Sequence, residues 1–244
     1  MIKMILNGAN GKMGQAVMAL VATKENTQIV YGADMDKPIC DAPKNADVIL
    51  DFSISNALDG ILDFARENKI PLVLATTGYS EAQLDKIKLA SQNIPILRSA
   101  TMSIGANLLM KLARETAEIL GEDFDAEILE KHHNMKVDAP SGVAYALAEE
   151  IASVRPGSEY IFDRTTQRKP RAKSEIGISS IRGGTIVGEH TVIFAGPHEV
   201  IELTHKSESR EIFAHGALRA AEFIVGKNAG LYSMADVIQR TINN

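Results

Sequence analysis

The sequence predicts an α/β protein in which a Rossmann-like, doubly wound parallel sheet is joined to a second α+β domain with an open mixed sheet. Two observations lead to this prediction. Over about the first hundred residues, short apolar runs alternate with amphipathic stretches, as strands and crossover helices do in a parallel sheet. Beyond residue 104 the pattern changes to runs rich in Ile, Val and Thr that are separated by glycine-containing turns, which is typical of paired strands.

The first domain is expected to alternate strands with helices. The predicted strands cover residues 2–6, 28–33, 48–52, 71–75 and 94–98. The predicted helices cover residues 12–23, 56–68 and 81–91. The third helix has the clearest start, because Ser80 is followed three residues later by Gln83. In such a capping box each side chain satisfies a free backbone N–H group of the other residue.

The second domain is expected to mix helices with sheet hairpins. A helix over residues 106–120 leads to a strand over 124–131, and a second helix follows Pro140-Ser141-Gly142. Three further strands are predicted over residues 175–182, 185–195 and 200–206. The pairs Gly183-Gly184 and Gly196-Pro197 separate them, which predicts two hairpins. The closing residues 210–225 are predicted to be helical.

The composition narrows the function classes. The 244 residues carry a net charge of -5, which argues against a protein that chiefly binds the phosphates of nucleic acid. No segment approaches the roughly 18 apolar residues that span a bilayer, and the apolar stretch at the N-terminus is too short for a signal peptide. The single cysteine, Cys40, suits a reducing compartment. We therefore expect a cytoplasmic protein without a nucleic-acid or membrane partner. The basic run 164–173 is expected to be a solvated loop; the alternative is a segment that closes over the substrate or contacts another subunit.

A glycine loop follows the first predicted strand and opens the first predicted helix. It reads Gly8-Ala9-Asn10-Gly11-Lys12-Met13-Gly14, with Asn10 where the second glycine of the usual motif stands. Glycines there let the backbone approach a pyrophosphate, whose charge is held by the N–H groups at the helix start. Asp34 lies twenty residues beyond Gly14, where a carboxylate can accept the ribose hydroxyls of an adenosine.

This arrangement favours NADH, because a 2′-phosphate would meet the like charge of Asp34. The ammonium group of Lys12 can reach such a phosphate, so NADPH stays open, whereas Met35 offers no charge. The alternative is that Asp34 only caps a turn. Two more loops follow predicted strands, Thr76-Thr77-Gly78 and Ser99-Ala100-Thr101-Met102, and are candidates for the nicotinamide half of the cofactor or plain turns.

Polar and titratable side chains gather between residues 130 and 142. Two adjacent histidines on an extended chain, His132 and His133, point to opposite faces, which is poor geometry for one metal ion, and we expect no metal site. Ser141 at a helix start can cap it, with free N–H groups aimed at a carboxylate. With Lys136 nearby, the segment predicts a pocket for a small dicarboxylic acid whose reaction needs a proton. The alternative is a solvated turn with a simple cap.

Residues 130–144, the glycine loop and Ile186-Val187-Gly188-Glu189-His190 resemble the 4-hydroxy-tetrahydrodipicolinate (dihydrodipicolinate) reductase family, and the resemblance extends to Gly230-Leu231-Tyr232-Ser233-Met234. It implies an enzyme of diaminopimelate and lysine biosynthesis. Such an enzyme reduces a cyclic unsaturated dicarboxylate with NADH or NADPH, after the 4-hydroxyl group has left as water. A homotetramer is also implied.

The resemblance implies roles for individual residues. His132 and Lys136 would be the catalytic proton-transfer groups. The substrate would be bound by His133, Ser141, Gly142 and Val143. The cofactor would be bound by Gly8, Ala9, Asn10, Gly11, Lys12, Met13, Asp34, Ala75, Thr76, Thr77, Ser99, Ala100, Thr101 and Met102. Residues 1–103 and 212–244 would form the dinucleotide-binding domain, and residues 104–211 the domain for substrate binding and oligomerisation.

Three residues depart from the family's common pattern: Val143 replaces a threonine, Met102 an aromatic residue and Met35 an arginine. The first removes a side-chain hydrogen bond and the last weakens a preference for NADPH. Two rival functions stay open. An amino-acid dehydrogenase with the same first domain would not need His132, His133 and Lys136 together, and a regulator that binds NADH would turn over no substrate.

Overall fold

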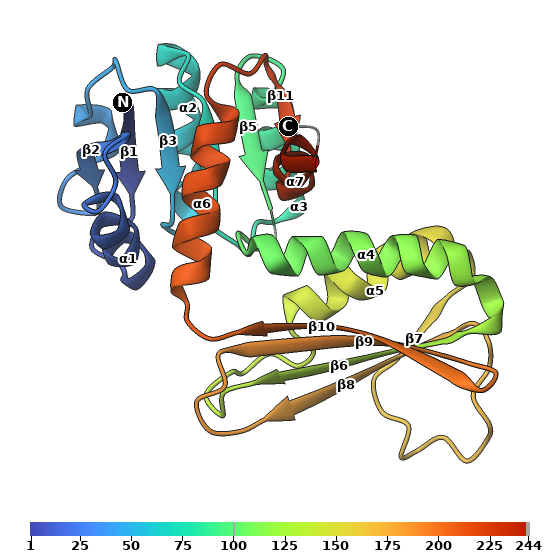
Figure 1. The fold of residues 1–244 in the computed structure, drawn as a ribbon. Helices are drawn as coiled ribbons and strands as arrows, with labels where there is room; N and C mark the ends of the chain where they lie inside the picture. The colour runs from blue at the N-terminus through green and yellow to red at the C-terminus, as the bar shows by residue number, and fades with distance from the viewer. Residues whose placement is uncertain (100, 243–244) are drawn as a thin grey trace. The chain divides into compact units, whose positions relative to one another are not determined.

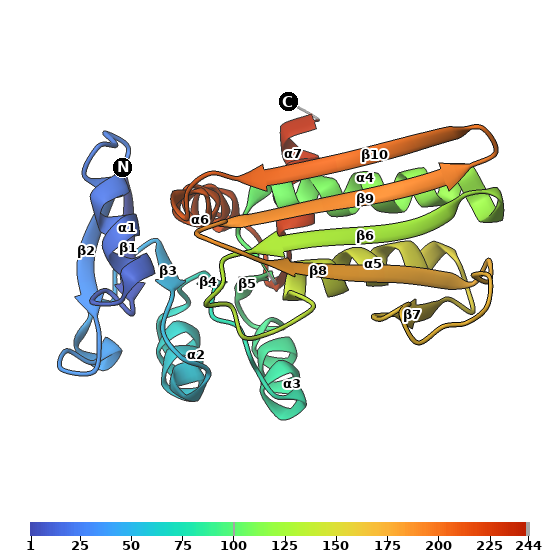
Figure 2. The same cartoon turned by 90° about the horizontal axis from the view of Figure 1, so that it is seen from below.

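The computed structural model describes residues 1–99 and 101–242 of the chain. The chain forms two compact units (Figure 1, Figure 2). The first comprises Met1–Ile104 and the segment that begins at Glu211, and the second comprises Gly105–Arg210. Each unit has its own sheet and its own hydrophobic core.

The first unit contains a six-stranded sheet in the order β11-β5-β4-β3-β1-β2, in which every pairing is parallel. Its strands are β1 (Ile2–Asn7), β2 (Thr27–Ala33), β3 (Val48–Asp51), β4 (Leu72–Leu74), β5 (Pro95–Arg98) and β11 (Gly230–Tyr232). The five predicted strands are confirmed, and β11 was not predicted. The strand order reverses between β1 and β3, which is where open α/β sheets bind ligands at the carboxyl ends of their strands.

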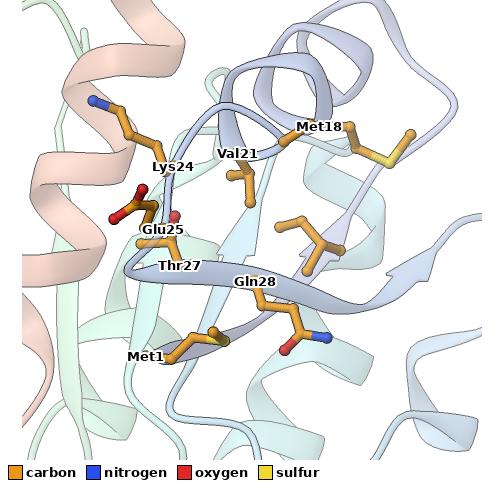
Figure 3. Close-up of a pocket in the computed structure, with 9 residues that line it drawn as sticks. Met1, Met18, Val21, Lys24, Glu25, Thr27 and Gln28 are labelled. Atoms are coloured by element: carbon orange, nitrogen blue, oxygen red, sulfur yellow. The ribbon is translucent and has the colours of Figure 1, made fainter.

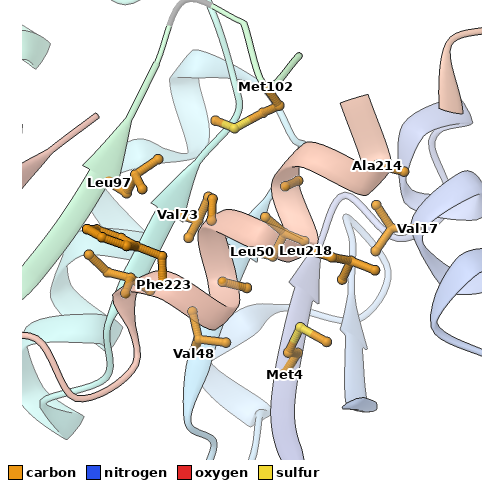
Figure 4. Packing of buried hydrophobic residues seen from close by; sticks show 14 of the residues in the cluster. Met4, Val17, Val48, Leu50, Val73, Leu97, Met102, Ala214, Leu218 and Phe223 are labelled. Atoms are coloured by element: carbon orange, nitrogen blue, oxygen red, sulfur yellow. The ribbon is translucent and has the colours of Figure 1, made fainter. Parts of the chain in front are cut away.

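Helices cover both faces of this sheet. One face packs against α1 (Lys12–Val21), α6 (Glu211–Ile224) and α7 (Met234–Ile242), and the other against α2 (Leu58–Asn68) and α3 (Glu81–Ala90). Met4 of β1 reaches the first core (Figure 4), as does Leu6, whereas Ile5 reaches the second, and all three are fully buried. Burial on both faces explains why the strands are continuous apolar runs. The capping box of Ser80 and Gln83 is present at the start of α3.

Helix α6 approaches the backbone of the segment after β5 very closely. A Cβ atom at Gly216 would lie 1.7 Å from the carbonyl oxygen of Met102. The side chain of Met102 is itself buried in the core that α6 covers (Figure 4). Gly216 is therefore the residue that lets α6 pack against this segment.

The second unit contains a five-stranded mixed sheet in the order β10-β9-β6-β8-β7. Its strands are β6 (Asp125–His132), β7 (Glu159–Ile161), β8 (Glu175–Arg182), β9 (Gly188–Gly196) and β10 (Glu199–Ser207). Helices α4 (Ile104–Leu120) and α5 (Gly142–Val154) pack against one face. Along β6 the residues alternate between this buried face and the other face, so Ile128, Glu130 and His132 all point toward the helices.

One of the two predicted hairpins is wrong. The hairpin at Gly196-Pro197 is confirmed, because β9 and β10 pair antiparallel. Strand β8 does not pair with β9 across Gly183-Gly184, because β6 lies between them, parallel to β8 and antiparallel to β9. The glycine pair instead bonds to the chain that leaves β6, with Gly183 N–H donating to His132 O at 2.9 Å. Strand β9 was predicted to begin at residue 185 and begins at Gly188, where its pairing with β10 begins.

The basic run 164–173 is more than a solvated loop. The side chain of Arg171 is only 17% exposed and pairs with Asp125 and Glu127 of β6. Arg164 pairs with Glu175, a buried carboxylate at the start of β8. These arginines therefore hold the connection between β7 and β8 against the sheet. Within the described residues, no helix combines the length and the apolar character needed to cross a membrane.

Replacing Gly216 by alanine is expected to lower the free energy of unfolding by about 2 kcal/mol or more, because the new methyl group forces α6 away from Met102. Gly60→Ala in α2 is the matched control. A Cβ there meets nothing within 4 Å, so the variant should gain about 0.5–1 kcal/mol from the better helix former. Urea unfolding of both variants tests this, and equal stability of the two would contradict the packing described.

Candidate active site

The glycine loop of the first unit has the close approaches that a dinucleotide-binding turn requires. Gly8 has φ 80°, and a Cβ atom there would lie 2.6 Å from the carbonyl oxygen of Phe52. A Cβ at Gly14 would lie 2.2 Å from the carbonyl oxygen of Gly8. The N-cap of α1 is Gly11, which has no side chain to bond the first N–H groups of the helix. This helix start therefore fits a pyrophosphate.

Asp34, at the end of β2, both fixes the glycine loop and lines a cavity. Its Oδ2 accepts a hydrogen bond from Asn10 N–H at 2.8 Å, and its Oδ1 accepts one from Met35 N–H at 2.8 Å. The capping role considered as the alternative is thus present. The cavity beside it, about 690 Å³ in volume, is also lined by Gly8, Asn10 and Gly11. Lys12 is exposed on the first turn of α1.

The two loops after β4 and β5 use their side chains in different ways. Thr76 is buried and its Oγ1 donates to Asp51 Oδ2 at 2.7 Å, whereas Ala75 is half-buried and Thr77 exposed. After β5, Thr101 and Met102 are buried and Ser99 is partly exposed, and Ala100 lies outside the described residues. Because the side chain of Met102 packs into the core, it leaves only its backbone for a ligand.

A buried carboxylate that the sequence analysis missed connects the carboxyl ends of neighbouring strands in the first sheet. Asp51, the last residue of β3, is fully buried. Besides Thr76, it accepts hydrogen bonds from Asn7 Nδ2 at 2.8 Å and Ser53 Oγ at 2.6 Å. Burial and the charge of Asp51 raise the pKa of Tyr79, whose hydroxyl lies 3.5 Å from the carboxylate. The available signal was an acidic residue that ends an apolar strand, with a serine two positions later.

A second cavity, of about 550 Å³, opens at the amino ends of the strands of the same sheet (Figure 3). Met1, which precedes β1, and Thr27, which begins β2, line it together with Met18 and Val21 of α1. Parallel sheets bind their ligands at the carboxyl ends of the strands. This cavity at the amino ends is therefore not the candidate cofactor site.

In the second unit, Glu130 and His132 of β6 form a hydrogen-bonded pair on the buried face. His132 Nδ1 lies 2.6 Å from Glu130 Oε2. Glu130 is fully buried and also contacts Arg182 of β8, whose two terminal nitrogens donate to its two oxygens at 2.9 and 2.7 Å. Burial acts to raise the pKa of Glu130, but the hydrogen bonds from His132, Arg182 and Ser180 outweigh it and hold the pKa below its usual range.

These contacts assign the protons of His132. An ionised Glu130 can only accept, so His132 Nδ1 carries a proton and donates it in this bond. The second ring nitrogen, Nε2, is then the one that can exchange a proton with a ligand. A Cβ atom at Gly188 would lie 3.0 Å from Nε2, so the absence of a side chain at Gly188 leaves space beside this nitrogen.

Ser141 caps α5 and links it to β9. Its Oγ accepts a hydrogen bond from Ala144 N–H at 3.2 Å and forms a second one with His190 Nε2 at 3.0 Å, whose direction is set by the tautomer of His190. Burial, together with the nearby charge of His132, lowers the pKa of His190 to about 3, which keeps its ring neutral. At Gly142 a Cβ atom would meet nothing within 4 Å, so the space there is open. Val143 is half-buried and packs against the core of the unit.

Lys136 and His133 lie on the turn that follows β6, outside the buried cluster. Lys136 Nζ donates to Asp138 Oδ2 at 2.9 Å, and this bond lowers the pKa of Asp138. His133 Nε2 lies 3.2 Å from a terminal nitrogen of Arg210, and desolvation followed by the charge of Arg210 lowers the pKa of His133. The turn therefore carries two cationic or proton-bearing side chains, and Arg210, from the segment between β10 and α6, joins them at His133. Arg210 was not predicted.

The structure also brings together a possible set of metal ligands that the sequence analysis missed. Potential donor atoms of Glu130, His132 and His190 lie within 4.8 Å of one another, because β9 places His190 directly beside Glu130. A cation here would displace the bond between His132 and Glu130 and would lie beside the guanidinium of Arg182. We therefore interpret these residues as a hydrogen-bonded network.

The buried, neutral state of His190 predicts a loss of stability in acid. The unfolded residue titrates near pH 6.5 and the folded one near pH 3, so between these values only the unfolded chain binds the proton. His190→Gln keeps a neutral polar group that does not titrate. Between pH 5.5 and 4, the unfolding free energy of the wild type should fall by about 1.4 kcal/mol per pH unit more than that of the variant. Parallel slopes in urea titrations would show that His190 is not buried as described.

Comparison with known proteins supports the interpretation of both units. The family model for the N-terminus of dihydrodipicolinate reductase matches residues 2–102, and the model for its C-terminus matches residues 105–238. The 4-hydroxy-tetrahydrodipicolinate reductase of Caldanaerobacter subterraneus subsp. tengcongensis is 47% identical over 250 residues, with 98% of this chain and 99% of the relative covered. The enzyme of the same name from Clostridium novyi is 48% identical with the same coverage.

Solved structures give a consistent result. A dihydrodipicolinate reductase from Paenisporosarcina sp. TG-14, solved with dipicolinate bound, has a TM-score of 0.77 and 26% identity, with 96% of this chain and 97% of that chain covered. An aspartate dehydrogenase from Thermotoga maritima is 11% identical with a TM-score of 0.51, over 93% of this chain and 98% of that chain, and shares the fold alone.

The two family models together match nearly all of the chain, the N-terminal model first and the C-terminal model directly after it. The N-terminal model covers β1 to β5 of the Rossmann-like sheet with the glycine loop, which supports a nicotinamide dinucleotide as cofactor. The C-terminal model covers the buried cluster around Glu130 and His132. The chain therefore belongs to the dihydrodipicolinate reductase family of oxidoreductases.

Proposed function

We propose that the chain catalyses the NAD(P)H-dependent reduction of 4-hydroxy-tetrahydrodipicolinate to tetrahydrodipicolinate, with loss of water, in the diaminopimelate and lysine pathway. The observation that carries the proposal is the cluster in the second unit. There an oriented histidine, His132, lies in one hydrogen-bonded network with Ser141, the N-cap of α5. Membership of the family, in which relatives at 47–48% identity bear this enzyme's name, supports the choice of substrate.

The start of α5 is the proposed binding site for a substrate carboxylate. Helix N-termini attract anions, because their first N–H groups have no partner within the helix. The backbone N–H groups of Gly142 and Val143 would bind the carboxylate, and the open space at Gly142 supports this. Ser141 keeps its hydroxyl on Ala144 and His190 and so positions the helix start. His133 would bind the same carboxylate through a ring N–H group. Dipicolinate, bound in the related structure, is the proposed probe of this site.

The proposed proton donors are Lys136 and His132. Bound NADH or NADPH would supply the hydride to carbon four of the substrate ring. Negative charge then develops toward the ring nitrogen or carbon three, where a proton must be delivered. The ammonium group of Lys136 would supply this proton, and His132 Nε2, held ready by the bond at Nδ1, would donate or accept in the same region. A cation there also stabilises the developing charge.

The proposed cofactor residues belong to the first unit. The N–H groups at the start of α1, with the glycine loop from Gly8 to Met13, would bind the pyrophosphate. The loops Ala75–Thr77 and Ser99–Met102 would contact the nicotinamide half. Asp34 lines the cavity next to the glycine loop, so a ribose hydroxyl is favoured there and NADH is the proposed preferred cofactor. The exposed ammonium group of Lys12 would still permit NADPH.

A coupled assay tests the function. The substrate is made in place from pyruvate and aspartate semialdehyde by the preceding synthase, and the loss of NADH or NADPH absorbance is followed in parallel. We expect oxidation that depends on the synthase and is faster with NADH. If the protein binds NADH by calorimetry but oxidises none of it, the substrate assignment is wrong and a regulatory protein becomes the better interpretation. Oxidation with an amino acid instead would indicate the rival dehydrogenase.

Lys136→Ala should lower kcat in this assay by about a hundredfold to ten-thousandfold, the usual contribution of a general acid. NADH affinity should be unchanged, because the proposed cofactor residues lie in the other unit. Lys86→Ala is the control, since Lys86 is an exposed lysine of the first unit that pairs with Asp59. Loss of NADH binding in Lys136→Ala, with kcat unchanged, would contradict the proposed role.

We also propose that the chain forms a homotetramer through the second unit. Among the described elements, α4 and α5 cover one face of the five-stranded sheet, while Ile181 and Val200 on the other face are 45% and 58% exposed. The family resemblance supports this proposal, and these two side chains serve as probes of the open face of the sheet. Sedimentation velocity should give four times the chain mass of 26.4 kDa, and Ile181→Lys with Val200→Lys should lower it. A wild-type monomer would refute the proposal.

A further inference from the structure

Glu130 stands out because it is a fully buried carboxylate that contacts three of the elements around the candidate substrate site in the second unit. Three of its neighbours belong to different elements: His132 on its own strand, Arg182 on β8, and Ser141 at the start of α5. Removing its charge from water is costly, and these hydrogen bonds and the ion pair with Arg182 offset that cost. We propose that Glu130 is the positioning residue of the reaction, one that acts through His132.

The first part of the argument concerns the direction of the histidine. The bond from His132 Nδ1 to Glu130 Oε2, at 2.6 Å, selects the form of the neutral ring that carries its proton on Nδ1. It also fixes the ring so that Nε2 points to the space left by Gly188. This inference rests on the proposed function, because His132 needs a defined proton-exchanging nitrogen only if it transfers protons to a ligand.

The second part concerns the turn that carries Lys136. Arg182, which binds both oxygens of Glu130, also donates to the carbonyl oxygen of Asp138 at 2.6 Å. The carboxylate of Asp138 in turn accepts a hydrogen bond from Lys136 Nζ. The position of the proposed proton donor thus depends on the same ion pair.

The third part concerns the binding of the substrate carboxylate. Glu130 Oε1 accepts a hydrogen bond from Ser141 N–H at 3.3 Å. This contact fixes the start of α5 through the backbone of its N-cap residue. The N–H groups of Gly142 and Val143 are left for the ligand. One buried charge therefore fixes the proton-transfer histidine, the turn with the lysine and the helix start at once.

The charged and titratable groups around His132 come from every element that packs against it. They are Glu130 on β6, Arg182 on β8, His190 on β9 and Lys136 on the turn that follows β6. The ring centroids of His190 and His132 are 5.1 Å apart. Of these, only Glu130 accepts a hydrogen bond from the ring of His132. A change at Glu130 should therefore alter the proton distribution on this ring.

Glu130→Gln is the primary test. Both oxygens of Glu130 accept from Arg182, but Oε1 also accepts from Ser141 N–H, so the amide oxygen should take the place of Oε1 and the amide nitrogen that of Oε2 beside His132. That nitrogen donates to Nδ1 and moves the ring proton to Nε2. We expect kcat to fall by about a hundredfold to ten-thousandfold, far more than any change in KM, with NADH affinity retained. Two-bond proton–nitrogen spectra of histidine-labelled protein should show His132 changing from the Nδ1–H to the Nε2–H form.

Glu175→Gln is the matched control. Glu175 is also buried, lies on β8 of the same sheet and pairs with an arginine, Arg164, but it does not contact His132. A purely structural role would make both variants lose stability and activity alike. The proposal predicts that Glu175→Gln keeps the kcat and the His132 spectrum of the wild type, whatever stability it loses.

Glu130→Asp covers the case in which Glu130→Gln does not fold. Aspartate keeps the charge that Arg182 requires, but its side chain is one methylene group shorter. Its carboxylate oxygen therefore lies farther from His132 Nδ1. We expect a folded enzyme with kcat lowered at least about tenfold and a shifted pH profile of kcat. Wild-type kcat and an unchanged His132 spectrum in the folded variants would overturn the proposal. The spectrum of the wild type is independent of turnover, so an inactive wild type with Nδ1–H on His132 would count against the proposed function instead.

Discussion

The ion pair between Glu130 and Arg182 is the interaction on which the second unit depends most. It joins two neighbouring strands, β6 and β8, at the end where the chain turns toward α5. Removal of one partner from a buried ion pair typically lowers the free energy of unfolding by about 3–5 kcal/mol, because the other charge is left unpaired in the protein interior. That penalty makes the arrangement rigid: any movement of the turn after β6 or of the helix start would break a hydrogen bond to a buried charge.

The first unit uses the same principle at the carboxyl ends of its strands. Asp51 is fully buried and holds Asn7, Ser53 and Thr76, which come from three adjacent strand ends. Asp34 bonds the backbone of the glycine loop in the same way. Each unit thus places a buried or partly buried carboxylate behind backbone segments whose N–H groups remain available for anionic ligands. The proposed contacts to the anionic groups of the ligands are N–H groups and cations, whereas Asp34 is proposed to contact a ribose hydroxyl.

Local patterns in the sequence predicted much of this fold, and long-range pairing was the part that they missed. The strands of the first sheet and the capping box at Ser80 are set by apolar periodicity and by a contact over three residues. The hairpin expected at Gly183-Gly184 failed because β6, more than 40 residues earlier in the chain, takes the place beside β8. The His-His-x-x-Lys segment marked the site, but its partner Arg182 lies 52 residues from Glu130, and no local rule connects them.

The most direct test of the account is a crystal structure of the protein with dipicolinate bound. We predict one carboxylate of the ligand at the N–H groups of Gly142 and Val143, with His132 Nε2 directed at the ligand and Nδ1 still bonded to Glu130. A ligand bound away from the start of α5, or a His132 ring turned away from Glu130 in the complex, would contradict the central claim that this buried carboxylate organises the substrate site.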